Sequence, residues 1–130
     1  MAADKTIRIL VVDDFESVAR TLKSQLRQLG FANVDVAMSG VEALEKIKAG
    51  PDYGLVLADW IMPDLTGLQL LQQIRQGNAS RDARVIMVTG NTDPKDVAAA
   101  KKAGVSGYVV KPYNLAALKQ RLEATLGSLD

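Results

Sequence analysis

The sequence contains no cysteine and no histidine among its 130 residues. Without cysteine there is no disulfide, no thiolate nucleophile and no Cys-ligated zinc. Without histidine there is no Ser-His-Asp triad, no His-ligated metal and no ordinary general base near neutral pH. Any chemistry must therefore use carboxylates, hydroxyls, lysine and the backbone, and any bound metal should be a hard cation that prefers oxygen.

Long apolar runs and an excess of one charge are also missing. No run approaches the roughly 18 residues of a membrane span, and the first eight residues, MAADKTIR, lack the apolar region of a signal peptide. The net charge of +1 does not suggest a nucleic-acid binder or a polybasic membrane-surface protein. We expect a cytoplasmic monomer with no nucleic-acid partner and no membrane insertion.

Strand-like and helix-like segments alternate five times along the chain. The first, third and fourth expected strands are nearly continuous β-branched or leucine runs, the composition of strands covered on both faces. The expected strands are 7–12, 34–37, 55–58, 85–88 and 107–110. Helix starts are indicated by a capping box at Ser39 and Glu42, by Asp93 before Pro94, and by Asn114. Glycines stand where the helices should end, at Gly30, Gly50, Gly77, Gly104 and Gly127.

Five βα units with short links predict an α/β fold, a doubly wound five-stranded parallel sheet with five helices on its two faces. Because no linker-like or repeated stretch interrupts the pattern, we expect one domain over residues 1–130, with its core at about 7–126 and no output domain. The fourth helix, around 96–103, has small side chains and few large apolar ones. It should therefore bury less area than the first, third or fifth helix and be held less tightly.

Polar residues follow four of the five expected strands. Asp13 and Asp14 follow the first, Asp59 the third, Thr89 the fourth and Lys111 the fifth. In doubly wound sheets, ligands bind outside the carboxyl ends of the strands, where the strand order reverses. We therefore expect three acids, a hydroxyl and a lysine to converge at one edge of the sheet.

Each of these residues also has an ordinary structural explanation. Asp14 is a possible cap of the first helix, Thr89 a plain strand residue, and Lys111 a solvated loop lysine. Together they favour a site, because close carboxylates repel by about 4 kcal/mol per pair at ~4 Å and an effective dielectric of ~20. One lysine leaves about two negative charges, which match a bound Mg²⁺ held by two carboxylates, a backbone carbonyl and waters.

An exposed aspartate beside such a cation can act as a nucleophile toward a phosphoryl group. Mg²⁺ and the Lys111 ammonium would offset the charge on the transferring oxygens, and positioning supplies most of the remaining catalysis. Thr89 would donate a hydrogen bond to the phosphoryl group, and Gly90 leaves space for it.

The same residues resemble the receiver domain of bacterial two-component response regulators, and within it the single-domain chemotaxis regulators of the CheY type. The matching stretches are VVDDF at 11–15, ADWIMPDLTGL at 58–68, MVTG at 87–90 and GYVVKPY at 107–113. Order and spacing fit from about residue 7 to 126. The resemblance implies a flavodoxin-like, CheY-like sheet with strand order 2-1-3-4-5.

The resemblance also implies the parts of a phosphorylation site. Asp59 resembles the phosphoacceptor, with Mg²⁺ bound by Asp14, Asp59 and the Ile61 carbonyl, and by Asp13 through a water. Lys111 resembles the phosphate-binding lysine.

Two further residues resemble the switch that responds to phosphorylation. Thr89 is similar to the switch hydroxyl, which moves toward the phosphoryl group, and Tyr108 to the aromatic residue that turns inward behind it. The peptide bond between Lys111 and Pro112 is expected to be cis, as in similar domains.

The partners implied by the resemblance are a histidine kinase of the CheA type as phosphodonor and a target protein such as a flagellar motor switch component. The target would read the face formed by the fourth helix, the fifth strand and the fifth helix. Such a protein is not an enzyme beyond its own phosphotransfer and autodephosphorylation. The alternatives are a phosphorelay intermediate or a phosphate sink that does not act on the motor.

Two positions depart from the pattern of CheY-like proteins. Position 61 holds isoleucine where a polar residue is frequent, and position 91 holds asparagine where an acid is common. In the family, side chains at these places tune the rate at which the phosphoryl group is hydrolysed. Our hypothesis is that Ile61 shields the phosphoryl group from water, and the same departure leaves open whether a CheY-type phosphatase acts here.

Other classes of protein fit the sequence less well. An aspartyl-phosphate phosphohydrolase of the haloacid dehalogenase type would need a second acid where Ile61 stands. A flavodoxin-like electron carrier would meet FMN phosphate with the repelling pair Asp13 and Asp14. A P-loop switch would need GxxxxGK[ST], which does not occur, and a degenerate receiver would not keep the full set of acids, threonine and lysine.

Overall fold

The computed structural model describes residues 2–130, so only Met1 of the expected domain lies outside the described residues. Strands and helices alternate throughout, as the sequence predicts. The elements are β1 (Ile9–Val12), α1 (Glu16–Gln28), β2 (Val34–Ala37), α2 (Gly40–Ala49), β3 (Leu55–Ala58), α3 (Gly67–Gln76), β4 (Arg84–Thr89), α4 (Pro94–Lys102), β5 (Gly107–Val110) and α5 (Leu115–Leu126).

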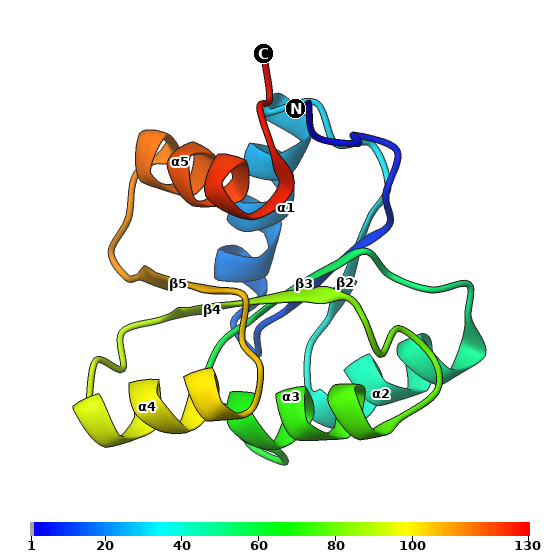
Figure 1. Cartoon of the computed structure of the whole chain (residues 1–130), viewed down its shortest axis with the longest axis vertical. Coiled ribbons are helices and arrows are strands. Elements are labelled where there is room, and N and C mark those ends of the chain that lie inside the picture. The colour runs from blue at the N-terminus through cyan, green and yellow to red at the C-terminus, as the bar shows by residue number, and fades with distance from the viewer. Residues whose placement is uncertain (1) are drawn as a thin grey trace.

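All five strands form one parallel sheet in the order β2-β1-β3-β4-β5, which confirms the expected topology (Figure 1). From β1 the chain first adds β2 on one side and then returns to add β3 on the other. The strand order therefore reverses between β1 and β3. Their carboxyl ends flank the crevice where doubly wound sheets bind ligands.

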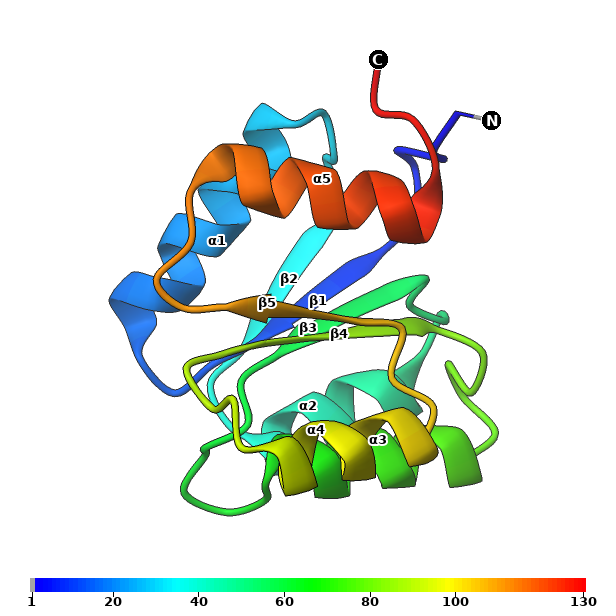
Figure 2. The ribbon, with the colours of Figure 1, turned by 60° about the vertical axis from the view of Figure 1, so that its left-hand side comes forward.

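Helices cover both faces of the sheet, with α1 and α5 on one side and α2, α3 and α4 on the other (Figures 1 and 2). Successive side chains of a strand point to opposite faces, so β1 contributes to two cores. Ile9 and Val11 pack with α1 and α5, whereas Leu10 and Val12 pack with the three helices of the other layer. This double burial explains why the central strands are almost wholly apolar.

Two strands, β1 and β4, differ in their bounds from the predicted ones. β1 begins at Ile9 rather than at residue 7, because the neighbouring strands begin opposite Ile9, at Val34 and Leu55. β4 is one residue longer at each end than predicted, and Thr89 pairs with Val110 of β5. Thr89 is therefore the last residue of a central strand, which holds its backbone rigidly.

The predicted helix caps are formed by side-chain hydrogen bonds, with one change of partner. Asp93 and Asn114 cap α4 and α5 as expected. Ser39 accepts from the Glu42 amide, but the Glu42 carboxylate accepts from Met38 rather than from Ser39. The second half of the predicted capping box is therefore made one residue earlier in the chain.

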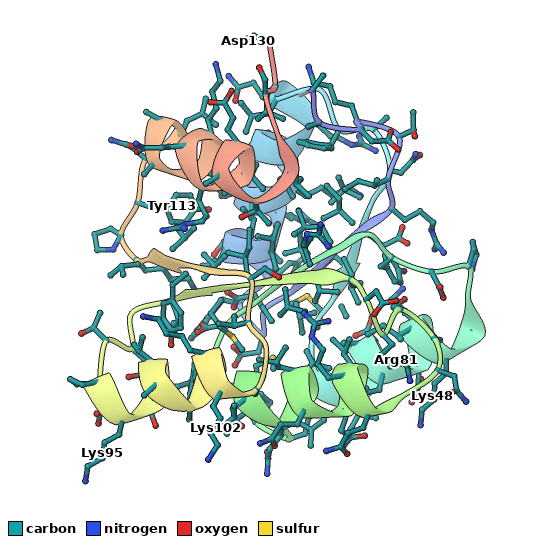
Figure 3. All side chains as sticks on the ribbon, viewed as in Figure 1. Lys48, Arg81, Lys95, Lys102, Tyr113 and Asp130 are labelled. Atoms are coloured by element: carbon teal, nitrogen blue, oxygen red, sulfur yellow. The ribbon has the colours of Figure 1, made fainter. Side chains whose placement is uncertain are left out.

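Helix α4 is the least buried helix of its layer. Ala100 is its only buried residue, whereas α3 buries Gly67, Leu70, Leu71 and Ile74. Lys95 and Lys102, at the two ends of α4, point away from the sheet (Figure 3). The prediction that α4 buries less area than the first, third and fifth helices, because its side chains are small, is thus confirmed. Within residues 2–130, no helix has the length and apolar character needed to cross a membrane.

Candidate functional site

The polar residues predicted to converge lie at the carboxyl edge of the sheet. Asp13 directly follows β1, Asp59 directly follows β3, and Lys111 directly follows β5. Thr89, at the end of β4, accepts a 3.0 Å hydrogen bond from the Lys111 amide through its carbonyl. The Lys111-Pro112 peptide bond is cis, as expected.

Lys111 is the centre of the site. Its Nζ donates to Asp13 Oδ2 at 2.9 Å and to Asp59 Oδ2 at 3.0 Å. The side chains of Asp13, Asp59 and Lys111 are only 5%, 12% and 23% exposed. Burial lowers the pKa of the Lys111 ammonium, but its hydrogen bonds to the two carboxylates outweigh this effect and raise the pKa above its ordinary value. The lysine therefore stays charged and holds two acids together.

Backbone amides fix the orientation of both bridged carboxylates. Asp13 Oδ1 accepts from the Phe15 amide at 3.0 Å, and Asp59 Oδ1 accepts from the Trp60 amide at 2.6 Å. The Asp59 amide in turn donates to the Val12 carbonyl at 3.1 Å, which extends the β1–β3 ladder by one residue. The chemistry-bearing side chain is therefore held by the buried strands.

Asp14 behaves differently from the other two acids. Its Oδ1 is buried and has no hydrogen-bond partner within residues 2–130. Nor does Asp14 cap α1, because the N-cap position belongs to Phe15 and makes no side-chain cap bond. A buried carboxylate oxygen without a partner is costly, and a bound cation would satisfy it.

The donor set fits Mg²⁺ rather than a densely ligated metal. Within residues 2–130, no group of three or more histidine, cysteine or acidic side chains is arranged to hold an ion. Mg²⁺ keeps several waters and needs only one or two carboxylates, so Asp14 and Asp59 with a backbone carbonyl are sufficient. Ile61, which would supply that carbonyl, is 71% exposed.

Thr89 is linked to the start of α4 through Asn91. The Thr89 side chain is buried, and its Oγ1 accepts from the Asn91 amide at 3.3 Å. The Asn91 Nδ2 donates to Asp96 Oδ2 at 2.8 Å, and its Oδ1 accepts from the Asp93 amide at 3.0 Å. The residue that departs from the family pattern thus joins the end of β4 to the first turn of the weakly anchored helix.

Tyr108 lies on β5, opposite Met87 of β4, and is half-buried. Its hydroxyl is fully buried and has no hydrogen-bond partner among residues 2–130. Burial raises the pKa of the Tyr108 hydroxyl, and the negative charges of Asp96 and Asp59 add to that effect. The Tyr108 hydroxyl is therefore close enough to Asp59 and to Asp96, in the first turn of α4, for their charges to affect its pKa.

Sequence reasoning missed two residues that shape the site. Gly67 begins α3 so close to the acid that a Cβ there would lie 2.5 Å from the Asp59 carbonyl oxygen. Asp64 accepts hydrogen bonds from the first amides of α2. A capping box at Thr66 and Gln69 also went unnoticed, although its T-x-x-Q pattern is legible in the sequence. The close approach at Gly67 and the hydrogen bonds of Asp64 depend on contacts between distant segments, so neither can be recognised from the local sequence.

Comparison with known families agrees with this geometry. The model of the response regulator receiver domain matches residues 9–123, almost the whole described chain. The chain belongs to the response regulator receiver domain family. The chain is 40% identical to the chemotaxis protein CheY1 of Helicobacter pylori J99, over 95% of this chain and 100% of that protein. It is also 40% identical to the chemotaxis protein CheY-3 of Vibrio cholerae O395, over 92% of each. This receiver domain is therefore of the chemotaxis-regulator type, a phosphoacceptor signalling protein rather than an enzyme with turnover.

Solved receiver domains share the fold. The chemotaxis protein CheY4 of Vibrio cholerae superposes with a TM-score of 0.85 at 28% identity, over 93% of this chain and 99% of that one. The receiver domain of a sensor histidine kinase from Pseudomonas aeruginosa PAO1, solved with magnesium in its active-site cleft, gives 0.82 at 28% identity, over 95% and 99%. The response regulator TrrA of Thermotoga maritima, solved in complex with Mg²⁺ and BeF, gives 0.81 at 35% identity, over 93% and 100%.

Proposed function

We propose that this receiver domain is a cytoplasmic response regulator that accepts a phosphoryl group on Asp59 from a histidine kinase. The observation that carries the proposal is the pair of bonds from Lys111 to Asp13 and Asp59 at the crevice between β1 and β3. In the transfer, a carboxylate oxygen of Asp59 forms the new bond to phosphorus as the bond to the donor histidine nitrogen breaks. Lys111, already in place, meets the charge that develops on the phosphoryl oxygens.

A magnesium ion would be held by Asp14, Asp59 and the Ile61 carbonyl, with Asp13 acting through a water. The unpartnered Oδ1 of Asp14 supports this assignment, as do the magnesium-containing structures of the P. aeruginosa and T. maritima relatives. When bound, the ion supplies positive charge that offsets the negative charge on the phosphoryl oxygens. The protein's own share is to hold its carboxylates in a fixed orientation.

Phosphorylation would then be transmitted through Thr89 and Tyr108. Thr89 moves toward the new dianion and donates its hydroxyl proton in a hydrogen bond, which strains its contact with Asn91. Tyr108 adjusts behind it, and the first turn of α4, held through Asp96, shifts with them. The face of α4, β5 and α5 changes as a result, because α4 has only one buried side chain to resist the movement.

The relatives' role in chemotaxis supports a kinase of the CheA type as donor and a flagellar motor switch component as target. A phosphorelay intermediate or a phosphate sink would use the same site and remains the second candidate. A phosphohydrolase is disfavoured, because position 61 offers no acid to activate water.

The phosphoacceptor assignment is tested by incubating the protein with acetyl phosphate and Mg²⁺ and measuring the incorporated phosphoryl group by mass spectrometry. We expect one phosphoryl group on the wild type and none on Asp59→Asn. Asp82→Asn, which removes an exposed acid from the α3–β4 loop, should be phosphorylated normally. Incorporation into Asp59→Asn, or none into the wild type, would refute the assignment.

The choice between motor and relay is tested by capture with purified candidate partners in the presence and absence of Mg²⁺ and a beryllium fluoride phosphoryl mimic. Capture of a flagellar switch component only with the mimic supports the motor reading. Capture of a histidine phosphotransfer protein alone, in either state, rejects it in favour of a relay.

A further inference from the structure

The loop between β3 and α3 is closed on itself at its base. The Gly67 amide donates to the Trp60 carbonyl at 2.8 Å, so residues 60–67 form a closed loop. This loop contains Ile61, whose carbonyl belongs to the proposed metal ligands. The position of that carbonyl therefore depends on what holds the rest of the loop.

Asp64 ties the far side of the loop to helix α2. Its Oδ1 accepts from the Gly40 amide at 3.0 Å, and its Oδ2 accepts from the Val41 amide at 2.8 Å. The first amides of a helix have no partner within it, and they carry the positive end of the helix dipole. The Asp64 carboxylate, 23 residues beyond Val41 in the chain, satisfies two of them, while Ser39 satisfies the third, on Glu42.

These hydrogen bonds lower the pKa of the Asp64 carboxyl, with the bond from Val41 as the largest cause. The carboxylate also accepts from the Leu65 amide at 2.7 Å, which fixes the backbone of the loop itself. Asp64 is thus ionised, and its carboxylate joins the β3–α3 loop to the first turn of α2.

A close contact beside Asp64 shows that the loop rests directly on α2. A Cβ placed on Gly40 would lie only 2.7 Å from the Leu65 Cβ. Gly40 is buried, so the absence of a side chain there is what allows the loop to approach. The contact and the two hydrogen bonds together leave the loop little freedom to move away from the helix.

We propose that Asp64 is a positioning residue for the metal site, which holds the Ile61 carbonyl in place by anchoring the β3–α3 loop to the amino end of α2. The inference rests on the proposed Mg²⁺-dependent function. It extends the site to a residue that does not touch the ion, the phosphoryl group or Asp59. Such outer partners of metal ligands typically change metal affinity by about 10- to 100-fold when they are removed.

The competing explanation is that Asp64 merely stabilises α2. Ser39 offers a matched control, because its hydroxyl caps the same helix through the Glu42 amide and, within residues 2–130, makes no hydrogen bond to the loop. Ser39→Ala should lower stability by about 1 kcal/mol, as the loss of an N-cap does. It should not alter Mg²⁺ affinity if positioning of the loop is the relevant effect.

The experiment is a titration with Mg²⁺, in which binding is measured by calorimetry and by Trp60 emission. The proteins compared are the wild type, Asp64→Ala, Asp64→Asn and Ser39→Ala. We expect Asp64→Ala to bind Mg²⁺ about 10-fold more weakly. Asp64→Asn should recover part of the affinity, since its carbonyl oxygen accepts but its amide nitrogen does not. If Asp64→Ala fails to fold, the test is the comparison of Mg²⁺ affinity between Asp64→Asn and Ser39→Ala.

The possible outcomes distinguish a failure of the positioning role of Asp64 from a failure of the proposed function. If the wild type binds Mg²⁺ and the Asp64 variants bind it equally well, the positioning role is wrong and the proposed function stands. If Ser39→Ala loses as much affinity as the Asp64 variants, the effect belongs to the stability of α2 and the positioning role is again wrong. If the wild type binds no Mg²⁺, the metal-dependent function and the inference fall together.

Discussion

Lys111 Nζ lies 3.0 Å from Asp59 Oδ2, although 52 positions separate the two residues. The same ammonium lies 2.9 Å from Asp13 Oδ2, at a separation of 98 positions. Two acids that would repel each other at this edge are thereby held by one cation, in a place where both are largely shielded from water. Under the proposed function, the site is assembled before a phosphoryl group arrives, and this would remove part of the reorganisation that the transfer requires.

Replacing Lys111 with methionine should destabilise the protein by about 1–3 kcal/mol, because the two nearly buried carboxylates lose the donor that satisfies them. The measurement is the free energy of unfolding in urea without metal. Lys119→Met is the matched control, because within residues 2–130 Lys119 bonds only the exposed carboxylate of Asp130. This variant should lose less than about 1 kcal/mol of stability. Equal losses of unfolding free energy in Lys111→Met and Lys119→Met would show that the bonds from Lys111 to Asp13 and Asp59 stabilise the protein no more than an exposed ion pair does.

Gly67→Ala should damage both the fold and the site. The new Cβ would meet the Asp59 carbonyl oxygen at 2.5 Å and Met87 Sδ at 3.0 Å, so the backbone that carries Asp59 must shift. We expect a loss of about 1–3 kcal/mol, as for other overpacked cores, measured by thermal unfolding. Gly90→Ala is the control, because a Cβ there would meet nothing within 4 Å and stability should be unchanged. A Gly67→Ala protein as stable as the wild type would contradict the structure here.

Ile61→Asn should shorten the lifetime of the phosphorylated state. An apolar side chain offers an attacking water no hydrogen bond, whereas asparagine offers one worth about 0.5–1.5 kcal/mol, so autodephosphorylation should be about 2- to 10-fold faster. The rate is followed by the decay of phosphorylated protein after the donor is removed.

Val41→Asn is the control for this experiment, because Val41 is also an exposed apolar residue but belongs to the first turn of α2. Its rate should match that of the wild type. An unchanged or slower rate in Ile61→Asn would reject shielding by Ile61.

Tyr53 should make stability fall at alkaline pH. Burial, together with the hydrogen bond to Asp35 and the charge of that carboxylate, raises the pKa of Tyr53 from 10.0 to about 12. A group whose pKa is raised by folding contributes stability below its unfolded pKa and loses that contribution as the pH rises through the folded value. The contribution, roughly 1–3 kcal/mol, should therefore be present below about pH 10 and disappear toward pH 12.

The check is urea unfolding of the wild type and Tyr53→Phe between pH 8 and 12. Phenylalanine keeps the ring beneath Arg8, whose guanidinium carbon lies 4.4 Å from the ring centroid, and removes only the titrating hydroxyl. Tyr108 and Tyr113 are present in both proteins, so the difference isolates Tyr53. Parallel stability curves for the two proteins across this range would disprove the assignment.

Much of this architecture is legible in the chain itself. The apolar runs that became β1, β3 and β4 identify strands buried on both faces, and polar residues at or directly after their carboxyl ends mark the edge where a site must lie. Local hydrogen bonding also fixed the caps at Asp93 and Asn114, because an N-cap depends only on neighbours two or three residues away.

Other features were decided only when distant segments met. The sequence predicted Asp13, Asp14 and Asp59 at one edge. Only the packed sheet shows that Lys111 binds Asp13 and Asp59, and that one oxygen of Asp14 has no partner among residues 2–130. The anchoring of the β3–α3 loop by Asp64 on α2 is of the same kind. Periodicity and turn chemistry act over a few residues, and so the sequence alone determines elements and edges. Hydrogen bonds between side chains from different elements depend on the exact register of the sheet, and so the tertiary structure determines which charges are paired.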